Sequence, residues 1–142
     1  NSVHYFVHLP YRLKDPAVIA KRLKDDTIND QAYYQLQVKF NEDGGGEDHQ
    51  DIYRYWFDQQ NFSLDYLAYK FYTNDGGMRF RNKRIEKKFN GVIFQNYDNF
   101  KPTSDTIQIN ELSKAFQNNQ MDKVSEIITN PISISPSKQN CN

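Results

Sequence analysis

The chain lacks the residues that several common kinds of site require. Its single cysteine, Cys141, stands beside the C-terminus, so no internal disulfide and no Cys-type zinc site can form. No apolar run approaches the ~20 residues that a membrane-spanning helix needs. No signal peptide is visible, and the sequence begins at Asn1 without Met. We therefore expect a processed chain or a fragment that lacks upstream strands.

The chain also has no excess of charge of either sign. Lys plus Arg is 18 and Asp plus Glu is 18, a balance that argues against a dedicated nucleic-acid binder. The hydrophobic fraction is only 37%, yet the chain holds ten Tyr, ten Phe and one Trp. Disordered chains are poor in aromatics, so this composition predicts a folded core. A length of 142 residues suits one domain.

Alternation of apolar and polar residues predicts antiparallel strands over 3–9, 34–40, 52–58, 62–73, 78–89, 92–100 and 122–129. Asp75-Gly76 and Asn90-Gly91 are strong hairpin signals. One short helix is expected from Asp15-Pro16 onward, and a second over 110–117. The segment 122–129 also fits a helix.

These patterns predict a mainly β (α+β) fold. We expect residues 1–130 to form a single domain, built as a curved antiparallel sheet or unclosed half-barrel of six to seven strands with two short covering helices. Residues 131–142 are rich in Ser, Pro and Asn, and we expect a mobile C-terminal tail there.

The glycine-rich loop at 41–51 fits no established ion-binding motif. It lacks the Gly-Lys-Ser/Thr of a phosphate loop and the acid spacing of an EF-hand. A looser calcium site from its acids remains open beside a solvated turn, which we favour. His4 and His8 stand about 13 Å apart on a strand, too far for one zinc ion. We therefore predict no metal site and no cofactor.

The predicted strand 78–89 is strongly cationic. Alternation places Arg79, Arg81, Lys83 and Lys87 on one face, with Arg84 and Lys88 on the other. Such a row could bind a phosphate, a carboxylate or a lipid head group. The alternative is a solvated face paired with acids of the neighbouring strand, such as Asp65.

Aromatic side chains occur on both faces of several predicted strands. One face must form the core, and the other either lines a ligand cavity or is covered by the helices. The candidate ligand-binding residues are Tyr53, Tyr55, Trp56, Tyr66, Tyr69, Arg79 and Arg81. No catalytic residue is predicted, because there is no Gly-x-Ser-x-Gly and Cys141 has no base nearby. Asp58 with Asp65 as a glycosidase pair has no support in its spacing.

The ordered segments LPYRLKDP, YYQLQVKF, GGGEDHQDIYRYW, LDYLAYKFY, GGMRFR and GVIFQNYDNFKP resemble an uncharacterised family of secreted or lipoprotein-like envelope proteins of Bacteroidetes-type bacteria. The resemblance covers residues 3–128. It implies a fold like that of the LolA/LolB lipoprotein carriers, an unclosed barrel whose apolar concave face is covered by helices. It also implies that the helix after Asp15-Pro16 is one such cover. It supplies no catalytic residue.

Three functions follow as hypotheses. The first is a non-enzymatic protein of the periplasm or cell envelope that binds a lipid or acyl chain on the concave aromatic face, with Arg79 and Arg81 at an anionic head group. The second is a structural module that docks another envelope protein. The third is a hydrolase that uses acids near the glycine-rich loop. None involves nucleic acid or a transmembrane span.

Overall fold

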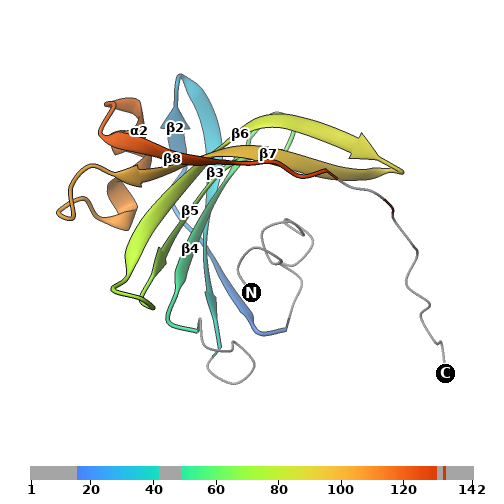
Figure 1. Ribbon diagram of the computed structural model, residues 1–142. Helices are drawn as coiled ribbons and strands as arrows, with labels where there is room; N and C mark the ends of the chain where they lie inside the picture. Colours follow the sequence, from blue (N-terminus) through green and yellow to red (C-terminus); the bar gives the residue numbers. More distant parts are fainter. Residues whose placement is uncertain (1–15, 42–48, 131–132, 134–142) are drawn as a thin grey trace.

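A computed structural model describes residues 16–41, 49–130 and 133 (Figure 1). It shows one antiparallel sheet of eight strands in the order β1-β3-β4-β5-β6-β7-β8, with β2 also paired to β3. The strands are β1 (Val18–Arg22), β2 (Asp26–Ile28), β3 (Gln31–Phe40), β4 (Ile52–Asp58), β5 (Leu64–Phe71), β6 (Gly77–Phe89), β7 (Val92–Pro102) and β8 (Met121–Ile127). A 3-10 turn, η3 (Ile109–Glu111), leads into the helix α2 (Leu112–Gln117).

Tight turns join most neighbouring strands and hold their register. Asn90 and Gly91 both have positive φ, as a two-residue type I′ hairpin requires. Asn29 and Asp30 do the same between β2 and β3. Gly77, at the start of β6, has a φ of 149°, and a Cβ there would lie 2.9 Å from the Phe71 ring. Because sequential strands are joined in this way, the sheet is a meander.

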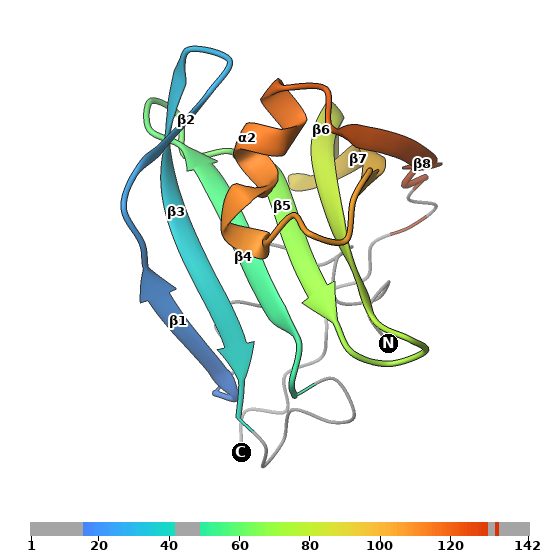
Figure 2. The same cartoon turned by 90° about the vertical axis from the view of Figure 1, so that its left-hand side faces the viewer.

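The two faces of the sheet carry separate hydrophobic clusters. The helix face is defined by Ile28, Tyr33, Trp56, Tyr66, Ala68 and Phe80, which pack with Leu112 of α2. The tyrosine face is defined by Val38, Tyr53, Tyr55, Leu64, Leu67 and Tyr97. Figure 2 shows α2 in front of β4 and β5, on the helix face. The sheet is therefore apolar on both sides, as the aromatics on alternating positions required.

Three β-bulges bend the sheet. The extra residues are Asp65 in β5, Arg84 in β6 and Val124 in β8, where the register shifts by one. A bulge increases the local twist and bends its strand. In Figure 1 the β6–β7 hairpin accordingly runs away from α2, toward the opposite side of the molecule. The sheet is curved and unclosed.

The helix expected from Asp15-Pro16 onward is wrong over 18–22, where the structure has strand β1. Ile19 and Leu23 fit a helical spacing, but Val18 and Ile19 are β-branched and the free edge of β3 offers backbone partners. Residues 25–31, where no strand was predicted, contain β2 and its tight turn. These two strands raise the number in the described residues to eight.

The faces of β6 also differ from the prediction beyond its bulge. Lys83 pairs with Tyr97, but Ile85 pairs with Asn96, the adjacent residue of β7. Adjacent strand residues point to opposite faces. Strict alternation predicted that Lys83 and Lys87 share a face. This prediction is wrong, because the bulge at Arg84 places Lys87 on the opposite face.

Other predictions are confirmed. The strand at 52–58 coincides with β4, and β3, β5, β6, β7 and β8 lie where alternation placed them, within a few residues. The helix predicted over 110–117 is η3 and α2. The predicted strand 3–9, most of the glycine-rich loop and the tail lie outside the described residues. None of the helices that the structure describes is long and apolar enough to cross a membrane.

Candidate functional site

The tyrosine face is the best candidate for a binding site, because polar groups lie among its aromatic rings. Register places Tyr53 beside Tyr69, and Tyr55 beside Leu67. The rings of Tyr53 and Tyr69 are stacked with centroids 6.0 Å apart. Tyr53 Oη donates a hydrogen bond of 3.3 Å to Asp51, which is itself buried. This face therefore combines a large apolar area with hydrogen-bonding groups.

A buried cation lies next to these rings. Arg81 of β6 is only 6% exposed, and register pairs it with Leu67. Its Nη2 donates to Tyr69 Oη over 3.2 Å, and its guanidinium carbon lies 5.2 Å from the centre of that ring. Burial lowers the pKa of the Arg81 guanidinium, and the Tyr69 phenol partly opposes this change. Arg81 thus brings positive charge into a region of low dielectric.

Asn99 of β7 pairs with Arg81 across the next strand boundary. Its Nδ2 donates to Ser125 Oγ over 3.1 Å. Its Oδ1 is buried and accepts no hydrogen bond within the part of the chain that the structure describes. A buried acceptor without a partner is costly, so this atom suits a donor from outside the protein. No local pattern in the sequence marks this residue, because only the β6–β7 pairing places it beside Arg81.

Tyr97 closes the far end of the tyrosine face. It is buried, it pairs with Lys83, and its hydroxyl donates to Gln95. Burial raises the pKa of the Tyr97 phenol, and the charge of Arg81 opposes that change. The phenol is therefore a neutral hydrogen-bonding group at neutral pH.

The structure brings five of the seven predicted ligand-binding residues onto one face, namely Tyr53, Tyr55, Tyr69, Arg79 and Arg81. Trp56 and Tyr66 pair with each other on the helix face, where they pack beneath α2. The Arg79 guanidinium carbon lies 5.3 Å from the Phe71 ring, and Arg79 Nη1 donates to the Met78 carbonyl. Arg79 is half-buried, so it lies nearer to solvent than Arg81.

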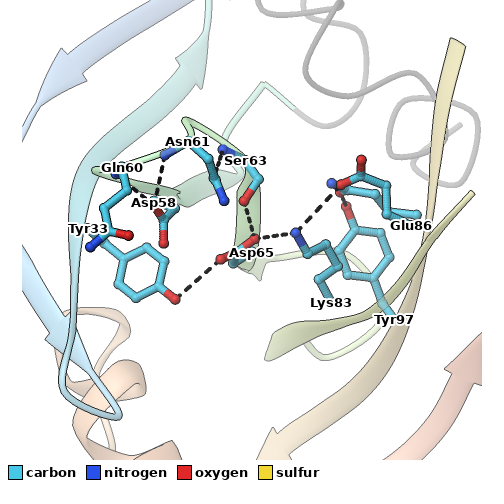
Figure 3. Close-up of polar contacts among 10 residues, drawn as sticks. Tyr33, Asp58, Gln60, Asn61, Ser63, Asp65, Lys83, Glu86 and Tyr97 are labelled. Atoms are coloured by element: carbon cyan, nitrogen blue, oxygen red, sulfur yellow. Dashed lines mark hydrogen bonds and ion pairs between the residues drawn. The ribbon is translucent and has the colours of Figure 1, made fainter. Parts of the chain in front are cut away.

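Asp65 lies at the centre of a second polar group (Figure 3). Lys83 Nζ lies 2.5 Å from Asp65 Oδ1, which also accepts from Ser63 Oγ at 2.6 Å. Tyr33 Oη donates to Asp65 Oδ2 over 3.3 Å, and Glu86 lies 3.7 Å from Lys83. The bulge at Asp65 places its carboxylate within reach of β3, β5 and β6. The pairing of the cationic strand with Asp65, weighed as an alternative above, is thus present for Lys83.

The geometry does not combine Asp58 and Asp65 into one acidic pair. Asp58 Oδ1 accepts hydrogen bonds from the backbone N–H groups of Gln60 and Asn61, so it stabilises the β4–β5 turn. Asp65 is engaged with Lys83. Over residues 16–41 and 49–130, no three His, Cys, Asp or Glu side chains are placed to hold a metal ion.

Comparison with known proteins places the chain in a family but assigns it no activity. No curated protein matches the chain, and no solved structure matches it. One family model does match, over residues 1–129, which is nearly the whole chain. Its description names no substrate, partner or reaction. The chain therefore belongs to the family of unknown function DUF6503.

Proposed function

We propose that the protein is a non-enzymatic protein of the cell envelope that binds an apolar or amphipathic molecule, such as a lipid or acyl chain, on the tyrosine face. The apolar part would lie along Tyr53, Tyr69 and Leu67. An anionic head would meet Arg79 and Arg81, and a hydroxyl group of a polar head would donate to Asn99 Oδ1. The periplasmic or envelope location is carried by the resemblance of the sequence alone, as is the likeness to lipoprotein carriers.

One observation carries this proposal, the juxtaposition of a buried guanidinium and an open buried acceptor on an aromatic face. Arg81 and Asn99 are directly paired, and Asn99 Oδ1 accepts no bond within the described residues. Ligand sites are typically apolar with a few converging polar groups, and this arrangement has that character.

The burial of this face predicts how a ligand would enter. Tyr55 and Leu67 are fully buried by the protein itself. A ligand therefore meets Tyr69 and Arg79 first, since both are only half-buried, and reaches the deeper residues when the covering atoms move aside. We expect association to be slow compared with diffusion, because it requires this conformational change.

The test uses the purified chain with two readouts. Organic-solvent extraction followed by mass spectrometry should reveal a co-purifying lipid, and 11-(dansylamino)undecanoic acid should bind with a rise in fluorescence. Arg79→Gln should weaken probe binding at least about tenfold, since a hydrogen bond to a charged group contributes about 1.5–3 kcal/mol. Arg84→Gln removes the same charge at an exposed position beside Asp98 and Glu126 and should leave binding unchanged. Absence of both lipid and probe binding would refute the proposal.

The docking alternative is favoured by a different observation. Ile85 and Ile128 are exposed, and they border a small pocket of 130 Å³ that Asn96 and Ile127 also line. Exposed apolar side chains around a depression are typical of a protein contact. If this region binds a second copy, Ile85→Ser with Ile128→Ser should abolish self-association in sedimentation velocity, while fatty-acid probe binding stays intact. A hydrolase has no supporting geometry in the described residues.

A further inference from the structure

Four cations from four different strands gather on the helix face, beyond the area that α2 covers. They are Lys21 of β1, Lys39 of β3, Arg54 of β4 and Lys70 of β5. In Figure 2, α2 lies over the upper part of the sheet, while β1 and the lower ends of β3 and β4 lie below it. We call these four residues the cationic patch.

Register shows that the four side chains share one face. Arg54 pairs directly with Ala68, which belongs to the cluster beneath Leu112 of α2. Lys21 pairs with Gln37, and Gln37 pairs with Arg54. Directly paired residues of antiparallel strands point to the same side, as do residues two apart on one strand.

The other two cations stand one step further from the helix. Lys39 is two residues beyond Gln37, and Lys70 is two residues beyond Ala68. Neighbouring strands lie about 4.8 Å apart, so cations two strands apart are separated by about 10 Å. The patch is therefore compact enough to act on a single anionic surface.

The patch contains no acid. The paired row that runs from Lys21 through Arg54 and Phe80 to Lys123 holds neither Asp nor Glu. Within the described residues, none of the four cations forms an ion pair. In a chain with equal numbers of acids and bases, this segregation of charge is a specific feature of the fold.

Arg54 shows that the patch is not simply solvated. Its Nε is buried and donates no hydrogen bond within the described part of the chain, and its Nη2 makes only a long contact of 3.5 Å with Gln37. The nearest acid on this face, Asp26, accepts a hydrogen bond of 2.9 Å from Trp56 Nε1. Burial lowers the pKa of the Arg54 guanidinium, and Asp26 opposes that change. A half-buried positive charge thus lies among the three lysines, and no acid forms an ion pair with it within the described residues.

Apolar side chains are interspersed with the cations. Ile19 pairs with Lys39 and is 51% exposed. Ile52 and Met78, which both pair with Lys70, are half-buried. Surfaces that bind membranes combine lysines with exposed apolar residues in this way. Beside Lys70, the centre of the exposed Tyr72 ring lies 5.3 Å from Lys70 Nζ. Single-stranded nucleic acid would instead need several exposed rings to stack successive bases.

We propose that the cationic patch binds the surface of a membrane that contains anionic lipids. The lysines contact the head groups, and Ile19 enters the boundary between head groups and acyl chains. Arg54, which is half-buried between them, adds positive charge beneath the lysines. This site is on the opposite side of the sheet from the tyrosine face, so it stands or falls independently of the function proposed above.

The experiment measures co-sedimentation of the full chain with vesicles of phosphatidylcholine alone or mixed with phosphatidylglycerol. We expect binding to the mixed vesicles only. Binding should fall when salt rises from about 0.1 M to about 1 M, because the Debye length shrinks from about 10 Å to about 3 Å. Lys39→Gln with Lys70→Gln should lower the partition coefficient about 25-fold, at about fivefold for each lysine near an anionic surface.

The matched control is Lys88→Gln with Lys101→Gln, which changes the net charge equally at two exposed positions outside the patch. It should leave binding to the mixed vesicles within about twofold of the unmodified chain. The proposal is overturned if the unmodified chain ignores both vesicle types, or if the two variants lose binding equally. It is also overturned if binding is insensitive to salt, or if a single-stranded oligonucleotide binds more tightly than the mixed vesicles.

Discussion

The β4–β5 turn contains a backbone conformation that suits glycine but is occupied by Phe62. Its φ is +60°, and its backbone N–H donates to the Asp58 carbonyl over 2.9 Å, which fixes the turn. A non-glycine residue in this left-handed region costs about 1–2 kcal/mol. The ring recovers part of this cost by stacking on Tyr34 with centroids 6.0 Å apart, although 67% of Phe62 is exposed. Two substitutions can therefore separate the energetic cost of the backbone strain from the stabilisation contributed by the ring.

Phe62→Ala keeps the strained backbone and removes the ring, so the free energy of unfolding should fall by about 0.5–1 kcal/mol. Phe62→Gly removes both. The relief of strain is partly offset by the greater freedom of glycine in the unfolded chain, about 0.4–1 kcal/mol. We therefore expect the Gly variant to be about 1 kcal/mol more stable than the Ala variant. Urea unfolding followed by the fluorescence of Trp56, the single and buried tryptophan, measures this difference.

The control is Ala32→Gly in β3, an exposed position without positive φ. There the same Ala-to-Gly change should destabilise the protein by about 0.5–1 kcal/mol. A Phe62→Gly variant that is no more stable than Phe62→Ala would refute the assignment of strain to this turn. It would mean that the loop relaxes to another conformation when the ring is removed.

Three further substitutions test other parts of the structure. Asp65→Asn should lower the free energy of unfolding in urea by about 2 kcal/mol, because it leaves the mostly buried Lys83 without its carboxylate. Glu86→Gln, more exposed and 3.7 Å from Lys83, should cost less than about 0.5 kcal/mol, and equal effects would contradict this ranking. Since burial raises the pKa of Tyr97, the folded state keeps this proton more tightly. Stability should therefore fall by up to about 1.4 kcal/mol per pH unit above about pH 10. Tyr97→Phe should flatten that alkaline fall, and an unchanged slope of urea midpoint against pH would exclude Tyr97 as its source. Leu112→Ala empties a fully buried position under α2 and should cost about 2–5 kcal/mol, whereas a loss below about 1 kcal/mol would show that α2 packs loosely.

Local patterns predicted most of the sheet, and the exceptions have a physical cause. Alternation and the Asn90-Gly91 turn are properties of neighbouring residues, so they located β4, β6 and β7 well. Ile19 and Leu23 satisfy a helical spacing, and only the free edge of β3 decides that their segment pairs as β1. No local signal reports an available strand edge.

The candidate sites depend even more on distant contacts. Alternation within β4 correctly separates Tyr55 from Trp56, yet it cannot say which of them α2 will cover. The bulge at Arg84 reverses the faces of the residues that follow, and nothing near it in the sequence marks the extra residue. Asn99 and the cationic patch become visible only when the register aligns separate strands. Sequence reasoning could therefore identify the aromatic and basic residues, but it could not predict which of them lie together on one face of the sheet.

Within the described residues, the unclosed sheet ends in two edges at which another chain could add a strand. On one side, β1 and β2 divide the edge beside β3 into lengths of five and three residues, with a break over residues 23–25. On the other, β8 presents Asp122, Lys123 and Glu126, and its bulge at Val124 interrupts the row of backbone groups. Short, charged or bulged edges resist edge-to-edge association. The bulge that bends β8 therefore also disfavours amyloid-like pairing of this edge with another chain. Deleting Val124 would straighten β8 and should make such pairing easier.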